Sequence, residues 1–493
     1  MKMRIHSVLF GVVLAAWPVL SAGQAQNPPA ENPPGQNAPL QDSVQNSVDA
    51  GARTPPAAAL SARVGMQEDA GDTYNTLPVI PALLGGVGIS PALLTDMERA
   101  NYLRAGINVG ATYDDNALLL SSGGSANTSE TIFPNLSLEH TSARMRWLFG
   151  YAGGLTVNQK FTNENQGSHN LNFDSQYRLS PHVNLRVAET FLLTTGLFDA
   201  GNGTQIGIGS GGPNGSLITP LATQRSSLTT VESNYHFALN DLVGTSGSFY
   251  DLHFSNPPTS VPAGSELTNQ LTGSETSTGS AFWLHRIFRE NWGGTSYRFE
   301  RITFNGGEAK VHSFLAVDTL NISTRFTVTG YAGPQYSENN GLIPGIAQPS
   351  QANNWSFAGG IDGAWRNART SVSGGYSRSI SDGGGILGAV RLQDVHGSVR
   401  RELVPGWVAA VNAARGNNDA LLLPGAGSPN KVDLTSVGVS LERNVGKSIG
   451  LRVGYSHDME KEFGLPAPNP TLDAQRNRFF VTLSYQWAKP LGL

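Results

Sequence analysis

Apolar and polar residues alternate along most of the chain after residue 102. In "YLRAGINVGATYDDN" (102–116), the apolar side chains of Leu103, Ile107 and Val109 share one parity, and polar or small residues occupy the other. The same period of two recurs near the end of the chain, in "RNRFFVTLSYQW" (476–487). Because successive side chains of a strand point to opposite faces, this pattern predicts β-strands with one apolar and one polar face.

The segments between the predicted strands alternate in length. Short ones, such as "LSPH" (179–182) and "LVPG" (403–406), carry residues typical of tight turns. Others are long and polar, such as "GLFDAGNGTQIGIGSGGPNGSLITPLATQ" (196–224). Counting hairpins gives about 18 strands, within a range of about 16–18. This rhythm predicts an all-β fold, a closed transmembrane antiparallel β-barrel with short periplasmic turns and long extracellular loops.

Soluble all-β folds fit the chain less well. A propeller or a solenoid needs a repeat of fixed period, whereas the loop lengths here vary widely. Aromatic residues fall near predicted strand ends, as expected for girdles at the two membrane interfaces; they are Trp147, Trp292, Trp355, Trp407, Tyr485 and Trp487. Basic residues crowd the short-turn side and acidic residues favour the long-loop side, which also indicates two chemically different ends.

The first hundred residues divide into three predicted segments. Residues 1–25 have the positive start, the apolar stretch and the small residues of a secretory signal peptide. Residues 26–75 are rich in Pro, Asn and Gln and are expected to form a disordered tether. Residues 76–101 are more apolar and are interpreted either as a periplasmic strap or as a small plug inside the barrel. The barrel itself is expected over 102–493.

Composition narrows the function. The 33 basic and 37 acidic residues give a formal net charge of −4, which argues against a nucleic-acid partner. The chain has no cysteine, so it has neither disulfides nor a thiolate metal site. Only 14% of the residues are charged, and the 58 glycines suit a chain that alternates faces throughout.

The last predicted strand resembles the closing strand of bacterial outer-membrane β-barrel proteins, which the barrel-assembly machinery reads. The residues that carry this likeness are Phe479, Val481, Leu483, Tyr485 and Trp487. In those proteins an aromatic residue ends the chain, whereas here "AKPLGL" follows Trp487. The resemblance implies a cell outer-membrane location, with lipid on the apolar face and the assembly machinery as a partner.

The first predicted strands resemble a narrower family. "GINVGATYDDNALLL", with its Tyr-Asp-Asp-Asn end at 113–116, and Phe133 with Pro134 in "FPNLSLEH" are similar to the opening of porins associated with exopolysaccharide export. The resemblance implies an outer-membrane pore that passes secreted polysaccharide.

A barrel of about 16 to 18 strands is wide enough for an aqueous channel, so its inner face should be polar. The residues expected to line the lumen are Arg104, Arg146, Asp174, Arg178, Arg186, Arg298, Glu300 and Arg452. They could select solutes as rings of charge, or they could simply be paired residues of the wall. The pair Asp114 and Asp115 is interpreted either as a solvated turn or as a Ca²⁺ ligand.

These features favour an outer-membrane pore for small solutes or secreted polysaccharide. The alternative is a plugged structural barrel whose long loops serve as a receptor or adhesin surface. No catalytic constellation can be proposed, because the ten histidines are scattered without a close pair or an HExxH motif. Neither an enzyme nor a cofactor is therefore expected.

Overall fold

A computed structural model describes most of the chain from residue 101 onward. The described ranges are 101–117, 124–142, 144–162, 166–194, 223–255, 273–288, 291–304, 307–323, 325–341, 350–383, 387–421, 431–446, 448–463 and 471–490. All of them lie within one compact unit, Ala52–Leu493. The predicted signal peptide, the predicted tether and the predicted strap or plug up to residue 100 lie outside the described residues.

The described residues form 18 β-strands. Their bounds are β1 Tyr102–Asp114, β2 Asn127–Thr141, β3 Met145–Asn158, β4 Gln166–Arg178, β5 Val183–Thr194, β6 Thr223–Ala238, β7 Asp241–Ser255, β8 Ser274–Phe288, β9 Asn291–Phe304, β10 Gly307–Ser323, β11 Phe326–Gly341, β12 Ser350–Arg366, β13 Thr370–Gly383, β14 Leu387–Val404, β15 Trp407–Ala420, β16 Lys431–Val445, β17 Ile449–Phe463 and β18 Thr471–Pro490. The expected strand number is confirmed.

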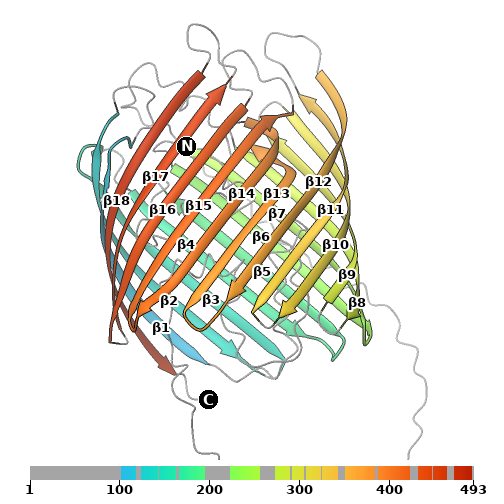
Figure 1. Ribbon diagram of the computed structural model, residues 1–493, viewed down its shortest axis with the longest axis horizontal. Helices are drawn as coiled ribbons and strands as arrows, with labels where there is room; N and C mark the ends of the chain where they lie inside the picture. The colour runs from blue at the N-terminus through green and yellow to red at the C-terminus, as the bar shows by residue number, and fades with distance from the viewer. Residues whose placement is uncertain are drawn as a thin grey trace, which may run out of the picture. The chain divides into compact units, whose positions relative to one another are not determined.

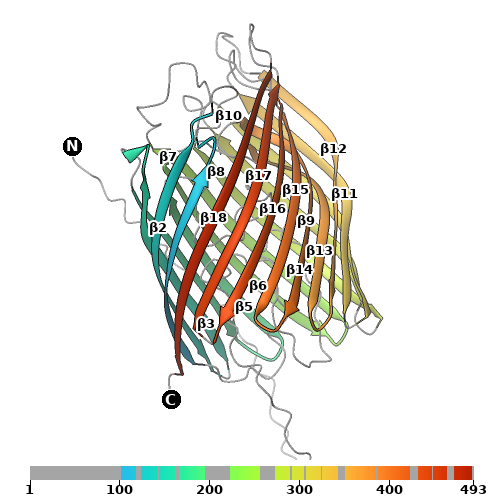
Figure 2. The same ribbon diagram turned by 60° about the vertical axis from the view of Figure 1, so that its left-hand side comes forward.

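Each strand pairs with its neighbours in the chain, and the last strand pairs with the first, which closes the sheet (Figure 1). The β1–β18 ladder is antiparallel and runs from Tyr102 opposite Pro490 to Asp114 opposite Arg478. Figure 2 shows the blue first strand beside the red last strand. The closed sheet leaves no first or last strand unpaired, as the membrane-spanning interpretation requires. The chain past Trp487 thus continues the wall as far as Pro490.

Side-chain burial follows the predicted alternation. On β1, Ile107 and Val109 are 40% and 44% exposed, whereas Asn108 between them is 1% exposed. On the other strands exposed apolar side chains likewise alternate with buried polar ones, except at the far ends of β13 and β14. The exposed face is therefore the apolar outside of the barrel, and the polar face turns inward.

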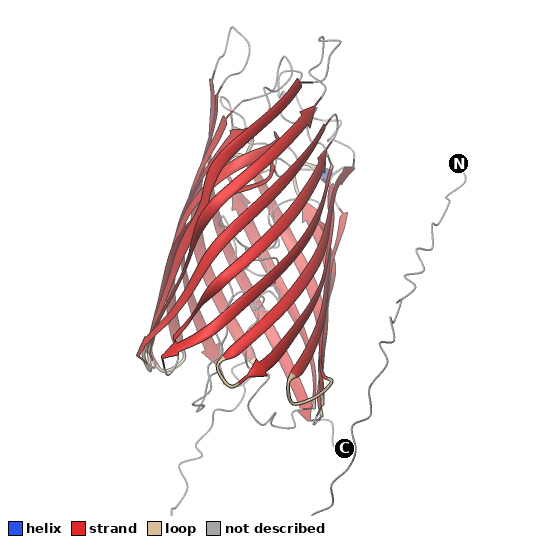
Figure 3. Cartoon of the chain, turned by 90° about the vertical axis from the view of Figure 1, so that its right-hand side faces the viewer, coloured by secondary structure: helices blue, strands red, loops and turns tan. Residues whose placement is uncertain are grey.

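The described tight turns gather at one end of the barrel (Figure 3). Asn367 closes the turn between β12 and β13, since its side-chain oxygen accepts hydrogen bonds from the backbone N–H groups of Arg369 and Thr370 at 2.9 and 2.7 Å. Gly406 supplies the positive φ of 82° required in the β14–β15 turn. The β14–β15 turn is the "LVPG" segment (403–406) that the sequence predicted as a tight hairpin. Among the described residues, no helix is long and apolar enough to cross a membrane.

Two strands contain a proline at a ladder interruption. The β2–β3 ladder omits Phe133 and Pro134, because proline has no N–H to donate. The facing Gly154 lies so close to β2 that a Cβ there would be 2.0 Å from the carbonyl oxygen of Ile132. Only glycine fits such an approach of two backbones. In the same way, Gly333 precedes Pro334 on β11 where the β10–β11 ladder is interrupted.

Part of the inner face is apolar. A cluster of buried side chains runs across β7 to β12 and consists of Leu242, Phe282, Leu284, Trp292, Leu315, Val317, Tyr331 and Ala358. We call it the inner apolar patch. Trp292 is only 3% exposed, so its assignment to the outer aromatic girdle was wrong. It has the inward parity of Arg298 and Glu300 on the same strand, and that parity decides its face. Trp355, in contrast, is 68% exposed.

Candidate functional site: the charged inner wall

The eight residues predicted for the lumen all occupy the strand face opposite the exposed apolar side chains. Arg104 on β1, for example, lies two positions before Gly106 and has the parity of buried Asn108. Arg186 has 8% exposure, whereas its neighbour Val187 is 40% exposed. Arg178 is half-buried at the turn end of β4.

The first group of inner charges joins three consecutive strands. Glu139 on β2 lies between Arg104 on β1 and Arg146 on β3. Its two carboxylate oxygens accept hydrogen bonds from Arg104 Nη1 at 3.4 Å and from Arg146 Nη2 at 2.8 Å. The Arg146 side chain remains 42% exposed, compared with 25% for Arg104. Arg146 is therefore the more accessible positive charge of this group.

The second group is more enclosed. Arg186 on β5 donates to both oxygens of Asp174 on β4, and its shortest contact is 2.6 Å from Nη2. Its Nη1 lies 3.6 Å from Oε2 of Glu232 on β6. The Glu232 side chain is 1% exposed, so Arg186 provides the positive charge next to a buried carboxylate. The predicted residues Asp174 and Arg186 are brought together here.

The remaining predicted residues, on β9 and β17, each contact only one or two of the side chains named below. Arg298 Nη2 lies 2.6 Å from Oε2 of Glu300, two positions further along the same face of β9. Arg452 on β17 donates from Nη2 to Ser440 Oγ at 3.2 Å, and its guanidinium carbon lies 5.9 Å from the ring centroid of Phe480. The eight predicted residues are thus distributed around the wall and do not form one site.

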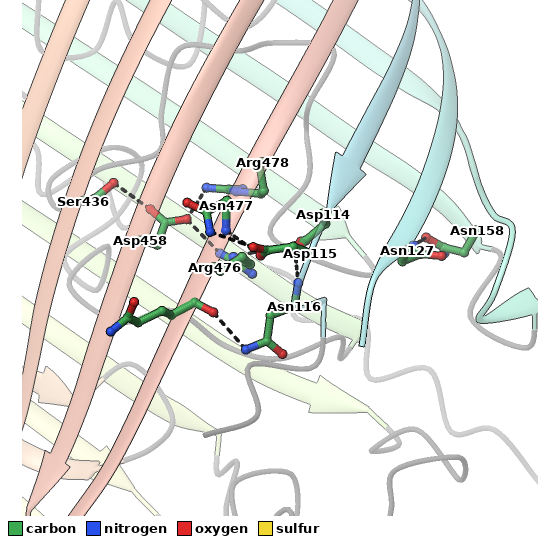
Figure 4. Close-up of polar contacts among 11 residues, drawn as sticks. Asp114, Asp115, Asn116, Asn127, Asn158, Ser436, Asp458, Arg476, Asn477 and Arg478 are labelled. Atoms are coloured by element: carbon green, nitrogen blue, oxygen red, sulfur yellow. Dashed lines mark hydrogen bonds and ion pairs between the residues drawn. The ribbon is translucent and has the colours of Figure 1, made fainter. Parts of the chain in front are cut away.

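The most buried charged cluster lies at the long-loop end of β1, β17 and β18 (Figure 4). Asp458 is 0% exposed, and one of its oxygens lies 2.6 Å from Arg478 Nη2 and 3.3 Å from Arg476 Nη2. Its other oxygen accepts a hydrogen bond from Ser436 at 2.7 Å. Asp114 lies 4.0 Å from Arg476 Nε. We call these residues the closing cluster, because it joins the last two strands to the first.

Asp114 and Asp115, interpreted either as a solvated turn or as a Ca²⁺ ligand, contact other residues of the wall, and the Ca²⁺ interpretation stays a prediction. Asp115 accepts hydrogen bonds from the backbone N–H and the side-chain amide of Asn477, both at 2.6 Å. Asn116 donates to the carbonyl oxygen of Gln475 at 2.9 Å. Asp114 is only 4% exposed. The Tyr-Asp-Asp-Asn stretch therefore fastens the end of β1 to β18, and a solvated turn is the wrong interpretation (Figure 4).

Sequence reasoning missed several inner residues, above all Glu139, Glu232, Arg476 and Arg478. The alternation itself could have found them, because each has the inward parity of its strand. Their positions also correct the predicted charge segregation. Buried Arg476 and Arg478 lie at the long-loop end, whereas Glu139 and Glu232 lie toward the turns. Pairing with an opposite charge across the ladder, and not the end of the barrel, decides where these charges lie.

The residues of the predicted assembly signal lie on the outside of β18. Phe479, Val481, Leu483, Tyr485 and Trp487 are all between 44% and 55% exposed. Between them, Phe480 and Thr482 are 6% and 5% exposed. Phe479 also packs on Tyr455 of β17, with ring centroids 4.8 Å apart.

The chemistry of the described wall is that of paired charges and hydroxyl or amide groups. Within the described ranges, no group of three or more His, Cys, Asp or Glu side chains could hold a metal ion. The inner face can therefore present fixed charge and hydrogen-bonding groups to a solute. Together with the apolar exterior and the closed 18-strand sheet, this inner face defines the class: a transmembrane antiparallel β-barrel.

No protein-family model matches the chain, and no curated protein matches it. Solved structures with a similar fold include Pseudomonas aeruginosa OpdQ, which is 11% identical with a TM-score of 0.41, the match covering 79% of this chain and 99% of OpdQ. Pseudomonas aeruginosa OprD is 9% identical with a TM-score of 0.39, over 81% and 98% of the two chains. The ferric citrate transporter FecA in its unliganded form is also 9% identical, with a TM-score of 0.38 and 78% of each chain covered. Likeness at this level does not establish a shared family or function.

Proposed function

We propose that the protein is an outer-membrane pore that passes hydrophilic solutes. The observation that carries the proposal is the division of one closed sheet into two chemical faces. Ile107 and its counterparts make the outside apolar, while Arg146, Arg186 and their partners make the inside charged. Fixed charges along the inner face of a channel set its selectivity for solutes.

Conductance of the purified full chain in a planar lipid bilayer tests the pore. We expect discrete current steps. A parallel gel assay should show faster migration of the unboiled protein, which reports a folded barrel. Folded protein that gives no current steps at any voltage would contradict the pore.

Arg146 allows a test of which face the ions meet. Its side chain is 42% exposed on the inner face, and Lys461 is 43% exposed on the outer face of β17. Arg146→Gln removes a positive charge from the lumen, so the reversal potential in a salt gradient should shift toward cation preference. Lys461→Gln is the matched control and should leave the reversal potential unchanged. Equal shifts in both variants would contradict a current path along the inner face.

The finer proposal concerns the solute. The resemblance of the stretches 106–120 and 133–140 to porins associated with exopolysaccharide export supports a secreted polysaccharide as cargo. An acidic polysaccharide added to one side of the bilayer should then interrupt the current reversibly. A pore that conducts ions but shows no interruption with acidic or neutral chains would contradict this cargo and leave the pore intact.

One observation favours a second candidate, a plugged barrel with a receptor or adhesin role. The inner apolar patch has exposures of only 1–6%, which is unusual for a wall in contact with channel water. A barrel that migrates as folded but never conducts would support this second function. The two candidates are therefore separated by the same bilayer measurement.

A further inference from the structure

The ladder between β12 and β13 stops halfway. It joins Arg366 with Ser371 near the turn and ends at Gly359 opposite Arg378. Both strands continue beyond this point, and each remains paired on its other side. The β11–β12 ladder reaches Ser350, and the β13–β14 ladder reaches Gly383. Within the described residues, the wall is therefore split from Gly359 up to the long-loop rim (the strands are labelled in Figure 2).

Burial shows that the far end of β13 and β14 has left the wall. On these strands Tyr376 and Val395 face outward and are 38% and 52% exposed. Ile380, Asp382 and Ala389 have the same parity, yet they are 2%, 2% and 3% exposed. Other side chains therefore cover the outward-parity face at Ile380, Asp382 and Ala389. We call the stretches 379–383 and 387–390 the rim hairpin.

The cover is the inner face of β8, β9 and β10. Ile380 and Ala389 pack against three inward-facing side chains, Ile302, Ala309 and Val311. Ser274 at the start of β8 donates a hydrogen bond to Asp382 Oδ2 at 2.6 Å. An outward-parity face can touch the inner side of these strands only if the rim hairpin folds into the barrel. The rim hairpin therefore lies inside the barrel, against the inner face of β8 to β10 at the long-loop end.

The sequence of the hairpin fits this position. Above Tyr376, the outward parity of β13 carries Arg378 and Asp382, and Arg391 of β14 lies opposite Ile380. Charged groups are unfavourable on a lipid-facing wall. The inward fold instead gives Asp382 a hydrogen-bond partner in Ser274.

The fold also leaves a second arrangement available. Continuing the observed register would place Ser356 opposite Ser381 and Phe357 opposite Ile380. That arrangement would extend the β12–β13 ladder, whereas the observed one keeps the apolar contacts of Ile380 and the Ser274–Asp382 hydrogen bond. Opposing gains of this kind are the basis of two-state structural elements.

We propose that the rim hairpin is a gate of the pore. Folded inward, it narrows the long-loop end of the lumen; aligned with β12, it completes the wall and widens the passage. The inference rests on the proposed pore function, since a gate needs a path to control. It adds a conformational switch to the wall that fixed side-chain charges alone would not provide.

Paired cysteines can hold each arrangement, because the chain has no cysteine of its own. Ser274→Cys with Asp382→Cys should lock the inward fold, since the two side chains already touch. Ser356→Cys with Ser381→Cys can form a disulfide only when the ladder closes. Ala364→Cys with Ser373→Cys is the control, because these residues are ladder partners in the continuous half.

Disulfide formation is read from gel migration, and conductance is measured before and after reduction. We expect the 356–381 disulfide to form and to raise conductance, the 274–382 disulfide to hold the low level, and the control disulfide to change nothing. A reductant should reverse both effects. The proposed gate is contradicted if the 356–381 pair never crosslinks while the control pair does. It is also contradicted if the 274–382 and 356–381 disulfide variants have the same conductance. If the 356–381 disulfide forms but no variant conducts, the pore fails while the movement of the hairpin stands.

Discussion

The barrel has two seams of opposite character. The β1–β18 seam joins the two ends of the sheet by a ladder along the whole of β1, and the Asp114–Arg476 contact and the Asp115–Asn477 hydrogen bonds reinforce it. The β12–β13 seam lies between neighbours in the chain, yet its ladder ends at Gly359. Continuity of the chain therefore does not secure the wall. At the β1–β18 seam, where no turn connects the strands, buried side chains hold them together. At the β12–β13 seam, where a turn connects the strands, their far ends separate.

The largest expected effect concerns the closing cluster. Asp458→Ala leaves Arg476 and Arg478 buried without their shared carboxylate, so the free energy of unfolding should fall by about 3–5 kcal/mol. Urea titration in detergent, followed by heat-modifiable migration, measures it. Asp473→Ala is the matched control, because the Asp473 side chain is 47% exposed and that of its partner Lys461 is 43% exposed. It should change the free energy of unfolding by about 0–1 kcal/mol. Equal losses in both variants would show that the buried ion pairs of the closing cluster stabilise the barrel no more than an exposed ion pair does.

The next effect belongs to the other seam. Ile380→Ala removes apolar contacts of the rim hairpin, and a buried Ile→Ala change costs about 2–5 kcal/mol. The effect should be local, with faster hydrogen exchange over 379–383 and 387–390 and little change in the global unfolding midpoint. Val395→Ala is the control, because the Val395 side chain lies on β14 outside the rim hairpin and is 52% exposed. A large drop in the global midpoint would show that the rim hairpin is an integral part of the wall.

A third variant probes the hydrogen bonds of the first seam. Asn477→Ala removes the side-chain donor to Asp115 but keeps the backbone N–H donor, and it also removes the partner of Tyr455 and His457 on β17. The free energy of unfolding should fall by about 1.5–3 kcal/mol, the value for a hydrogen bond to a charged group. The same urea titration applies. An unchanged midpoint would mean that the ladder alone fastens β1 to β18 at this end.

The smallest expected effect is at the other end of β18. Trp487→Ala removes an outward ring that is 44% exposed, and interfacial aromatic packing of this kind contributes about 0.5–1.5 kcal/mol. If Trp487 belongs to an assembly signal, the heat-modifiable form should also appear more slowly in cells. Val453→Ala, 47% exposed on the neighbouring strand β17 and outside the predicted signal, is the comparison. If Trp487→Ala lowers stability but assembles at the normal rate, Trp487 contributes to packing and is not part of an assembly signal.

The fold was predictable because its signal is local. Ile107 next to Asn108 already indicates which way each side chain points, and the turn residues give the hairpin rhythm. The partners of the inner charges were not predictable in this way. Asp458 meets Arg476 and Arg478 only through the register of β17 on β18, which no single strand contains. Trp292 was misplaced because its nearness to a strand end was weighed above its parity.

The alternation pattern did not predict that the β12–β13 ladder ends at Gly359, although the sequence contains one signal of it. Arg378, Asp382 and Arg391 interrupt the outward apolar parity, and a charged outward run at the end of two paired strands marks a segment that does not face lipid. What covers that segment depends on strands far away in the sequence, β8 to β10. Nothing in the local pattern carries that information.

The closing ladder also constrains how the chain reaches its native state. Asp115 and Asn477, bonded to each other across it, are 362 positions apart in the sequence. Contacts of such high sequence separation form late and slowly, because a long loop must close before they contribute. Until then β1 and β18 both present unpaired edges, which are prone to intermolecular pairing. Closure is therefore expected to be the rate-limiting step of folding and the one most in need of assistance.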